Sequence, residues 1–234
     1  MGSSAVTALV WSELLVDLEY YKDCILFYRL GDFYEMVFED AVTVSRELEL
    51  TLTGKSCGLE ERAPMCGVPF HAAETYLNRL VGKGYRVAIC EQVETPEEAK
   101  KRGGTKAVVK REVVRLVTAG TLTEDNMLDA RSNNYLLCCC MEEKNFGFAW
   151  IDLSTGDFYT KNVNFGIHDK EDVFQAFLSY IDACEIIVSD KMLRISPIFN
   201  ILKRYQEKLT VLPQARFNVL NAKQMLEKFF NIQT

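Results

Sequence analysis

Hydrophobic positions divide the first half of the chain into short alternating segments. Apolar residues recur at helical spacing over residues 6–21, and a continuous apolar run over residues 24–28 has the length of a buried strand. The pair Gly31-Asp32 interrupts this run, and Glu35 follows at the spacing of a helix capping box. The pattern therefore predicts a strand, a turn, and a helix over residues 32–47 that begins at Asp32.

The remainder of the first half continues the alternation of strands and helices. A helix is predicted over residues 71–81, ending at two glycines. Strands are predicted over residues 50–53, 86–90 and 108–117, and residues 63–68 form an apolar run that ends at Pro69. Strands that alternate with helices indicate an α/β domain.

A different pattern begins after residues 118–133, which are predicted to be a linker because of their turn-forming composition. Three strands then follow at close spacing, over residues 134–141, 146–153 and 157–163, with short polar turns between them. Further helices (172–181, 195–205, 222–230) alternate with further strands (185–188, 209–212). This order resembles the ribonuclease H-like architecture, so we expect two domains, residues 1–117 and 134–234.

The composition is that of an ordinary globular protein with an acidic balance. Hydrophobic residues make up 48% and charged residues 26% of the 234 residues, and the formal net charge is −6. This charge argues against a protein that holds DNA through a broad basic surface. A local basic run fits either a solvated loop and strand edge or a local phosphate contact, and comprises Lys100, Lys101, Arg102, Lys106, Lys110, Arg111 and Arg115.

Cysteine usage and hydropathy indicate a cytoplasmic protein with no membrane partner. None of the eight cysteines forms a C-x-x-C pair, and several lie inside apolar runs, so we expect reduced and buried thiols. No apolar run is long enough to predict a membrane span. Residues 1–7 lack the basic start of a signal peptide.

Three patterns suggest catalytic or metal chemistry, and each is incomplete. Gly54-Lys55-Ser56 is similar to the end of a P-loop, but Glu49 stands where that motif needs its first glycine. Asp152 and Asp157 fit either a metal-dependent nuclease or a polar turn, and the turn is the better match. Neither of the two histidines has a partner at metal-ligand spacing. We therefore expect no metal and no cofactor.

The stretch after Gly31 holds more aromatic residues than a turn requires. Phe33 fits either a core aromatic or a ring that projects beyond the sheet. Glu35 fits either the second half of a capping box or a functional carboxylate. The residue pattern alone leaves both alternatives open at each position.

Several blocks together are similar to one known family. Residues 27–36, Phe-Tyr-Arg-Leu-Gly-Asp-Phe-Tyr-Glu-Met, resemble the signature of the MutS family of bacterial DNA mismatch-repair recognition proteins. Further blocks agree in order and spacing, at residues 50–53, 63–72, 87–93 and 109–115. The resemblance covers residues 24–153 closely and the rest of the chain loosely.

The resemblance implies an α/β chain in which a mixed-sheet mismatch-recognition domain precedes a connector domain with a ribonuclease H-like fold. Mispaired double-stranded DNA is the implied partner, and the connector domain is implied to contact downstream mismatch-repair proteins. The alternative is a protein-interaction module of the repair complex that binds no DNA measurably on its own.

The resemblance also assigns roles to five residues. In this family the aromatic residue of a Phe-x-Glu motif enters DNA from the minor groove and stacks beside a mispaired base, and the glutamate contacts the same base. These roles fall on Phe33 and Glu35. Lys55 is implied to contact a phosphate, and Leu30 and Met65 are implied to give apolar support beside the wedge.

The physical logic of these roles can be stated independently of the family. A mispair is weakly stacked, so inserting a ring and kinking the duplex costs less there than at a paired step. A carboxylate is repelled by phosphates, and it recovers that cost only where a base offers a donor or where the acid is protonated. Phe33 is therefore expected to supply affinity, and Glu35 to supply discrimination.

The chain departs from the family pattern at several points. Val37 stands where the family has an aromatic residue, Ala119 stands where it has a proline, and residues 1–20 lack the usual opening. The family's lever, clamp and ATPase domains do not appear in these 234 residues, and the connector domain is expected to be incomplete. We therefore expect no enzymatic activity from this chain, and only weak DNA binding when it is alone.

Overall fold

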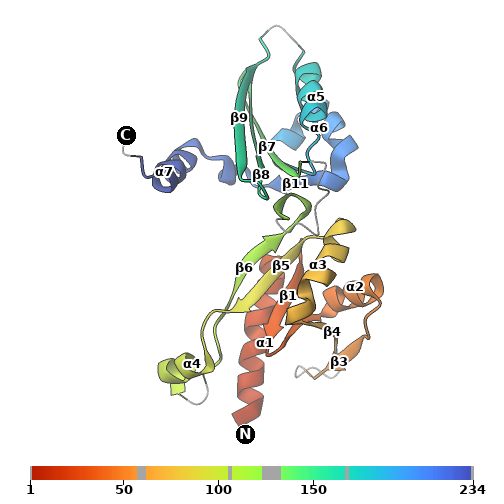
Figure 1. Ribbon diagram of the computed structural model, residues 1–234, viewed down its shortest axis with the longest axis vertical. Helices are drawn as coiled ribbons and strands as arrows, with labels where there is room; N and C mark the ends of the chain where they lie inside the picture. The colour runs from red at the N-terminus through yellow and green to blue at the C-terminus, as the bar shows by residue number, and fades with distance from the viewer. Residues whose placement is uncertain (1, 57–61, 105–106, 123–132, 167–168, 233–234) are drawn as a thin grey trace. The chain divides into compact units, whose positions relative to one another are not determined.

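The computed structural model describes residues 2–56, 62–104, 107–122, 133–166 and 169–232. The chain divides into two compact units, Met1–Thr118 and Ala119–Thr234, and each is described by itself (Figure 1). Within the described ranges, no helix combines the length and the apolar character needed to cross a membrane.

A six-stranded mixed sheet forms the centre of the first unit. In the order of their positions across the sheet, its strands are β3 (Thr53–Lys55), β4 (Ala63–Pro69), β2 (Phe33–Val37), β1 (Ile25–Leu30), β5 (Val87–Gln92) and β6 (Arg111–Val117). β1 and β5 run parallel, and every other neighbouring pair is antiparallel. The sheet is therefore mixed, as expected for the first domain.

Helices cover both faces of this sheet. On one face, Trp11 and Leu14 of α1 (Gly2–Tyr20) share a buried cluster with Tyr28 and Val37. On the other side lie α2 (Phe38–Leu48) and α3 (Ala73–Gly82), which follows the short helix η1 (Phe70–Ala72) (Figure 1). Side chains at successive strand positions point to opposite faces, so β1 and β2 contribute to both layers of the core.

The prediction of a helix over residues 32–47 was wrong at its start. The chain turns at Gly31, where φ is +60°, and returns as the strand β2 before α2 begins at Phe38. The N-cap of α2 is Val37, and no side chain caps it, so neither Asp32 nor Glu35 forms the predicted capping box. Over residues 33–36 the more exposed Phe33 and Glu35 alternate with the buried Tyr34 and Met36, a period of two that a strand satisfies and a helix would not.

Two smaller differences also concern the first unit. β3 lies at Thr53–Lys55 and not at residues 50–53, and an unpredicted helix, α4 (Pro96–Gly103), follows β5. A capping box does occur here, because the side chains of Thr95 and Glu98 bond each other's backbone N–H.

The second unit contains a five-stranded sheet with the predicted ribonuclease H-like order. The meander β7 (Tyr135–Glu142), β8 (Asn145–Asp152) and β9 (Asp157–Asn164) is antiparallel. β10 (Glu185–Ser189) lies parallel to both β7 and β11 (Leu209–Leu212), which gives the order β11-β10-β7-β8-β9. The predicted fold class, α/β with two mixed sheets, is confirmed.

Helices pack on one side of this sheet around an aromatic core. Rings of Phe146, Phe148 and Phe174 lie against one another between the meander and α5 (Lys170–Ile181). The same unit contains α6 (Ser196–Leu202) and the short helices η3 (Ala119–Thr121), η4 (Met192–Arg194), η5 (Lys203–Lys208) and η6 (Gln214–Phe217). Most of the predicted linker, at residues 123–132, lies outside the described residues.

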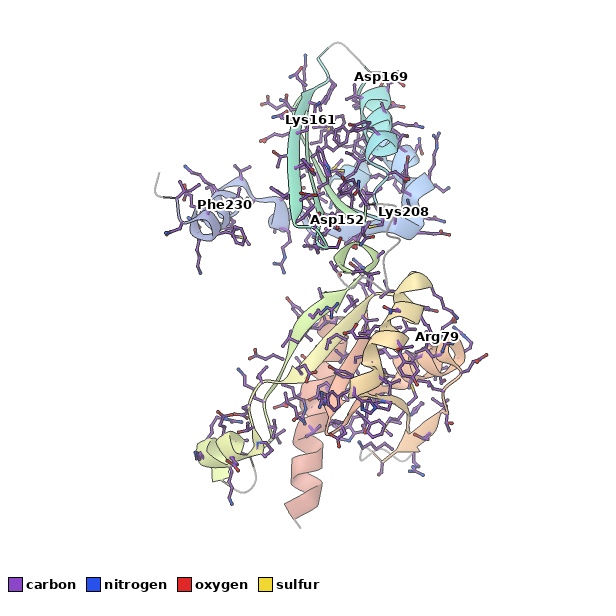
Figure 2. All side chains as sticks on the ribbon, in the orientation of Figure 1. Arg79, Asp152, Lys161, Asp169, Lys208 and Phe230 are labelled. Atoms are coloured by element: carbon purple, nitrogen blue, oxygen red, sulfur yellow. The ribbon has the colours of Figure 1, made fainter. Side chains whose placement is uncertain are left out.

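The last helix, α7 (Val219–Phe230), differs from the other α-helices because none of its residues is buried. Figure 2 shows Phe230 on this helix, at a distance from the side chains of the sheet. Its large apolar side chains are all more than half exposed, as for Leu220, Met225 and Phe229.

Candidate nucleic-acid interface

The β1–β2 hairpin places an exposed aromatic ring and a carboxylate on one face of the sheet. The register pairs Leu30 with Phe33 and Tyr28 with Glu35, and directly paired residues of neighbouring strands point to the same face. Phe33 lies next to the turn and is 47% exposed. Tyr34, between Phe33 and Glu35, points to the opposite face and is buried.

Strands β3 and β4 extend this face. The register pairs Glu35 with Gly67 and Val37 with Met65, and Lys55 lies beside Ala63. The structure therefore brings together all five residues predicted for the site, on one face of four neighbouring strands: Leu30, Phe33, Glu35, Lys55 and Met65.

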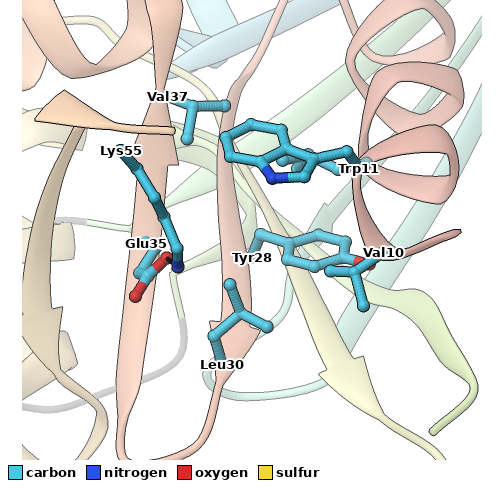
Figure 3. A pocket seen from close by; sticks show the side chains of 8 residues that line it. Val10, Trp11, Tyr28, Leu30, Glu35, Val37 and Lys55 are labelled. Atoms are coloured by element: carbon cyan, nitrogen blue, oxygen red, sulfur yellow. Dashed lines mark hydrogen bonds and ion pairs between the residues drawn. The ribbon is translucent and has the colours of Figure 1, made fainter. Parts of the chain in front are cut away.

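An ion pair fixes the carboxylate of this face. Lys55 Nζ donates to Glu35 Oε2 at 2.7 Å, and both side chains are partly exposed (Figure 3). The pair forms one wall of a cavity of about 190 Å³, whose other walls are apolar and aromatic: Val10, Trp11, Leu14, Tyr28, Leu30 and Val37. A carboxylate and an ammonium thus stand at the edge of an otherwise apolar surface.

Gly67 allows the backbone of β4 to pass close to the hairpin. A Cβ at this position would lie 3.2 Å from the carbonyl oxygen of Tyr34 and 3.9 Å from Cδ1 of Phe33. The first distance is tighter than an ordinary contact, so a larger residue would push against the hairpin that carries Phe33. Glycine is therefore part of what positions the exposed ring.

The opposite side of the hairpin is fixed by a polar network that the sequence did not reveal. The hydroxyl of Tyr34 donates to Glu91 of β5, and Arg29 Nη1 lies 3.4 Å from the same carboxylate. The Arg29 guanidinium also stacks 3.8 Å from the ring centroid of Phe70. Burial, together with the bond to Glu91, raises the pKa of Tyr34 to about 12, so it remains a hydrogen-bond donor. The sequence signal for this network is a charged residue inside each of two apolar runs, Arg29 in the first and Glu91 in the second.

The basic run on residues 100–115 mostly makes local contacts within the described chain. Arg102 pairs with Glu94 at 2.6 Å, and Arg111 Nε donates to the carbonyl oxygen of Arg29 at 2.8 Å. Arg115 and Lys110 pair with Glu74 and Glu112. Lys106 lies outside the described residues. These contacts favour the interpretation of a solvated edge over that of a phosphate-binding surface.

The carboxylate of Asp152 belongs to a turn. It is 3% exposed and accepts hydrogen bonds from the backbone N–H of Asn134 (2.8 Å), the backbone N–H of Ser154 (3.0 Å) and the Ser154 hydroxyl (2.6 Å). Burial acts to raise the pKa of Asp152, but these bonds outweigh it and hold the pKa below its usual value. Across the described ranges, no three His, Cys, Asp or Glu side chains are grouped so that they could hold a metal ion.

Both compact units match models of one protein family. Residues 16–126 match MutS domain I, and residues 134–234 match MutS domain II. The chain belongs to the MutS family. The candidate face of the β1–β2 hairpin lies inside the MutS domain I match, and the turn with Asp152 lies inside the MutS domain II match. Neither match indicates an enzymatic role for these residues.

Individual MutS relatives agree over most of the chain. The DNA mismatch repair protein MutS of Ruminiclostridium cellulolyticum is 48% identical over 92% of this chain, and that of Ehrlichia chaffeensis is 44% identical over 99%. The MutS protein of Lachnoclostridium phytofermentans is 59% identical over 62% of the chain. These matches cover 24%, 27% and 15% of the relatives, so the chain spans about a quarter of the length of the first two.

Proposed function

We propose that this chain recognises mispaired or unpaired bases in duplex DNA, as the N-terminal part of a mismatch-repair protein. One observation carries the proposal: Phe33 exposes its ring at the end of a hairpin, on the same sheet face as the Glu35 carboxylate. The family membership and the printed names of the relatives, DNA mismatch repair protein MutS, support the same function.

Phe33 acts as the wedge. Its ring lies next to the turn, where the backbone of Gly67 passes close to the hairpin and Leu30 is the paired residue of β1. A ring held in this way can enter a weakly stacked step without losing much conformational freedom. Leu30 and Met65 extend the apolar surface on the same face, where they support the displaced sugar and base edges.

Glu35 acts as the discriminator. It lies two residues from Phe33 on the same face of β2, so it reaches the base beside which the ring stacks. Its negative charge disfavours an approach to ordinary duplex. A base with a free hydrogen-bond donor offsets this repulsion, and paired bases offer fewer such donors than a mispair does.

The test compares matched duplexes of one sequence, with and without a single mispair, in titrations of the chain at low ionic strength. We expect Phe33→Ala to reduce the affinity for the mispaired duplex by about tenfold, which corresponds to about 1.4 kcal/mol, and to leave homoduplex binding nearly unchanged. Phe158→Ala is the matched control, because Phe158 is 51% exposed on β9 of the other unit. A Phe33→Ala variant that retains the full preference for the mispair overturns the proposal.

A second candidate is a protein-interaction module that binds no DNA on its own. The observation in its favour is the apolar surface of α7, where Leu220, Met225 and Phe229 are exposed. The same titration separates the two candidates, because this module shows no binding to either duplex at any ionic strength.

A further inference from the structure

The Glu35 carboxylate has an unusual set of contacts for a group that is 19% exposed. Lys55 Nζ binds one oxygen, Oε2, at 2.7 Å. Over the described residues, this is the one polar contact of the Glu35 side chain, and Oε1 accepts no hydrogen bond. Figure 3 shows the Lys55 ammonium against one oxygen of Glu35 and the second oxygen turned away from it.

We propose that Lys55 is a specificity-determining residue that acts by positioning Glu35, and that it is more than a contact for DNA phosphate. In this role it fixes the carboxylate on the sheet face through Oε2 and leaves Oε1 to accept a hydrogen bond from a base. The inference rests on the proposed function, because it presupposes that Glu35 meets a base.

Geometry supports the positioning role. Lys55 lies at the end of β3, the edge strand of the sheet, and its ammonium reaches across β4 to Glu35 on β2. Gly67 is the residue of β4 that pairs with Glu35, and having no side chain it leaves this path open. A glutamate without this partner would sample several rotamers above an apolar cavity.

Electrostatics supports the same role. A lone carboxylate beside Phe33 would oppose the approach of every duplex, mispaired or not, because of repulsion by phosphates. The Lys55 charge at 2.7 Å offsets part of that repulsion at a distance, and it leaves the short-range acceptor Oε1 in place. The discrimination then depends on whether the nearest base offers a donor, and less on the overall charge of the site.

The alternative is that Lys55 binds a phosphate independently of Glu35. A phosphate contact carries no sequence or mispair information, so its loss weakens binding to all duplexes by one common factor. A positioning residue instead changes the ratio of the mispair affinity to the homoduplex affinity, and it does so only while Glu35 is present. The two roles therefore make different predictions for a double-mutant cycle.

The experiment measures both affinities for the wild-type chain, Lys55→Met, Glu35→Gln and the double variant. We expect Lys55→Met to reduce the ratio of mispair to homoduplex affinity by roughly fivefold in the Glu35 background, and to leave it unchanged in the Glu35→Gln background. Lys55→Arg should not restore the full ratio, because a guanidinium tends to bind a carboxylate through both oxygens and would occupy Oε1.

The matched control is Lys83→Met. Lys83 pairs with Glu47 at 2.9 Å with similar exposure, between α2 and the end of α3. This variant should change neither affinity, which separates a loss of positioning from a general loss of an ion pair.

The positioning role is overturned if Lys55→Met lowers the affinity for both duplexes by the same factor, and does so equally in the Glu35 and Glu35→Gln backgrounds. Lys55 would then be a phosphate contact only. The two proposals also fail separately. If Phe33→Ala abolishes the mispair preference while the cycle shows no coupling, only the positioning role is wrong. If wild-type chain shows no mispair preference, both are wrong.

Discussion

Each compact unit has a hairpin with carboxylates near its turn, and the two hairpins use them differently. In the β8–β9 hairpin, the pair of residues next to the turn is Asp152 and Asp157. Asp152 is buried and accepts three hydrogen bonds. In the β1–β2 hairpin, the corresponding pair is Leu30 and Phe33, and the ring of Phe33 is exposed.

The hydrogen-bond partners distinguish a carboxylate that stabilises the fold, Asp152, from one that keeps an oxygen available for a ligand, Glu35. Both oxygens of Asp152 accept hydrogen bonds from donors of its own chain, so this carboxylate is committed to holding the turn. Glu35 has one occupied oxygen, lies in the middle of a strand, and stands beside an exposed aromatic residue. The sequence shows an acid near a turn in both cases, and the hydrogen-bond partners tell the two apart.

Among the carboxylate substitutions, the largest expected effect is that of Asp152→Asn. An amide would place an N–H group opposite a donor of the chain, so we expect the free energy of unfolding of the second unit to fall by about 2–3 kcal/mol. The chain has two tryptophans, and urea unfolding of the second unit can be followed by Trp150 fluorescence in a Trp11→Phe background. Asp157→Asn, at an exposed position, should change this free energy by less than about 0.5 kcal/mol.

The Asp152 effect should also depend on pH. Because the pKa of Asp152 is lowered in the folded state, its contribution is present above the pKa of the unfolded chain and is lost as the pH falls through the folded value. The difference between the wild-type chain and Asp152→Asn should therefore shrink in acid. An equal difference at neutral and acid pH would contradict the assignment to ionised hydrogen bonds.

A third carboxylate sharpens the comparison. Asp40, in the first turn of α2, accepts one hydrogen bond, from the N–H of Leu26 at 2.8 Å, and burial raises its pKa from 3.8 to about 6. A raised carboxyl pKa means that stability falls as the pH rises from the unfolded value to the folded value. In the wild-type chain, Asp40 should lower the free energy of unfolding by about 2 kcal/mol between pH 4 and pH 7. Asp40→Asn should abolish this part of the decrease. Unfolding free energies of both proteins at the two pH values are the measurement.

A smaller effect is expected for Glu35→Ala. The loss of a partly exposed ion pair should change the free energy of unfolding by less than about 1 kcal/mol. Removal of the negative charge should raise homoduplex affinity by roughly threefold at low ionic strength, and less at high ionic strength. Unchanged homoduplex binding in a titration over several salt concentrations would show that Glu35 does not act as the discriminator.

The smallest effect on stability is expected for Phe33→Ala. The ring is about half exposed, so its removal should change the free energy of unfolding by less than about 0.5 kcal/mol. Phe27, on the neighbouring strand, is fully buried, and Phe27→Ala should cost about 3–5 kcal/mol. If the two variants lose similar stability by urea unfolding, Phe33 is a core residue and the contrast between the hairpins fails.

The contrast also explains which elements could be predicted. The meander of the second unit followed from the sequence, because short polar turns separate three alternating runs. For the β1–β2 hairpin the sequence instead predicts a strand and a helix, because Asp32 and Glu35 have the spacing of a capping box and β2 is only five residues long. Local pattern could not distinguish a short strand from a first helical turn.

The candidate residues were found through the resemblance, but their contacts were not. Lys55 and Glu35 are 20 positions apart, and Arg29 and Glu91 are 62 apart, so no helical or strand spacing links either pair. Both pairs form because the strand order places β3 two strands from β2 and places β5 directly beside β1 in one sheet. Such contacts depend on topology, which the pattern of apolar residues leaves open.

The most direct test of the wedge is the fluorescence of a 2-aminopurine base placed next to a mispair. This base is quenched while stacked, so insertion of the Phe33 ring should raise its fluorescence when the wild-type chain is added to the mispaired duplex, and not when it is added to homoduplex. Phe33→Ala at saturating concentration should give no such increase. An equal increase from the Phe33→Ala variant would contradict the account.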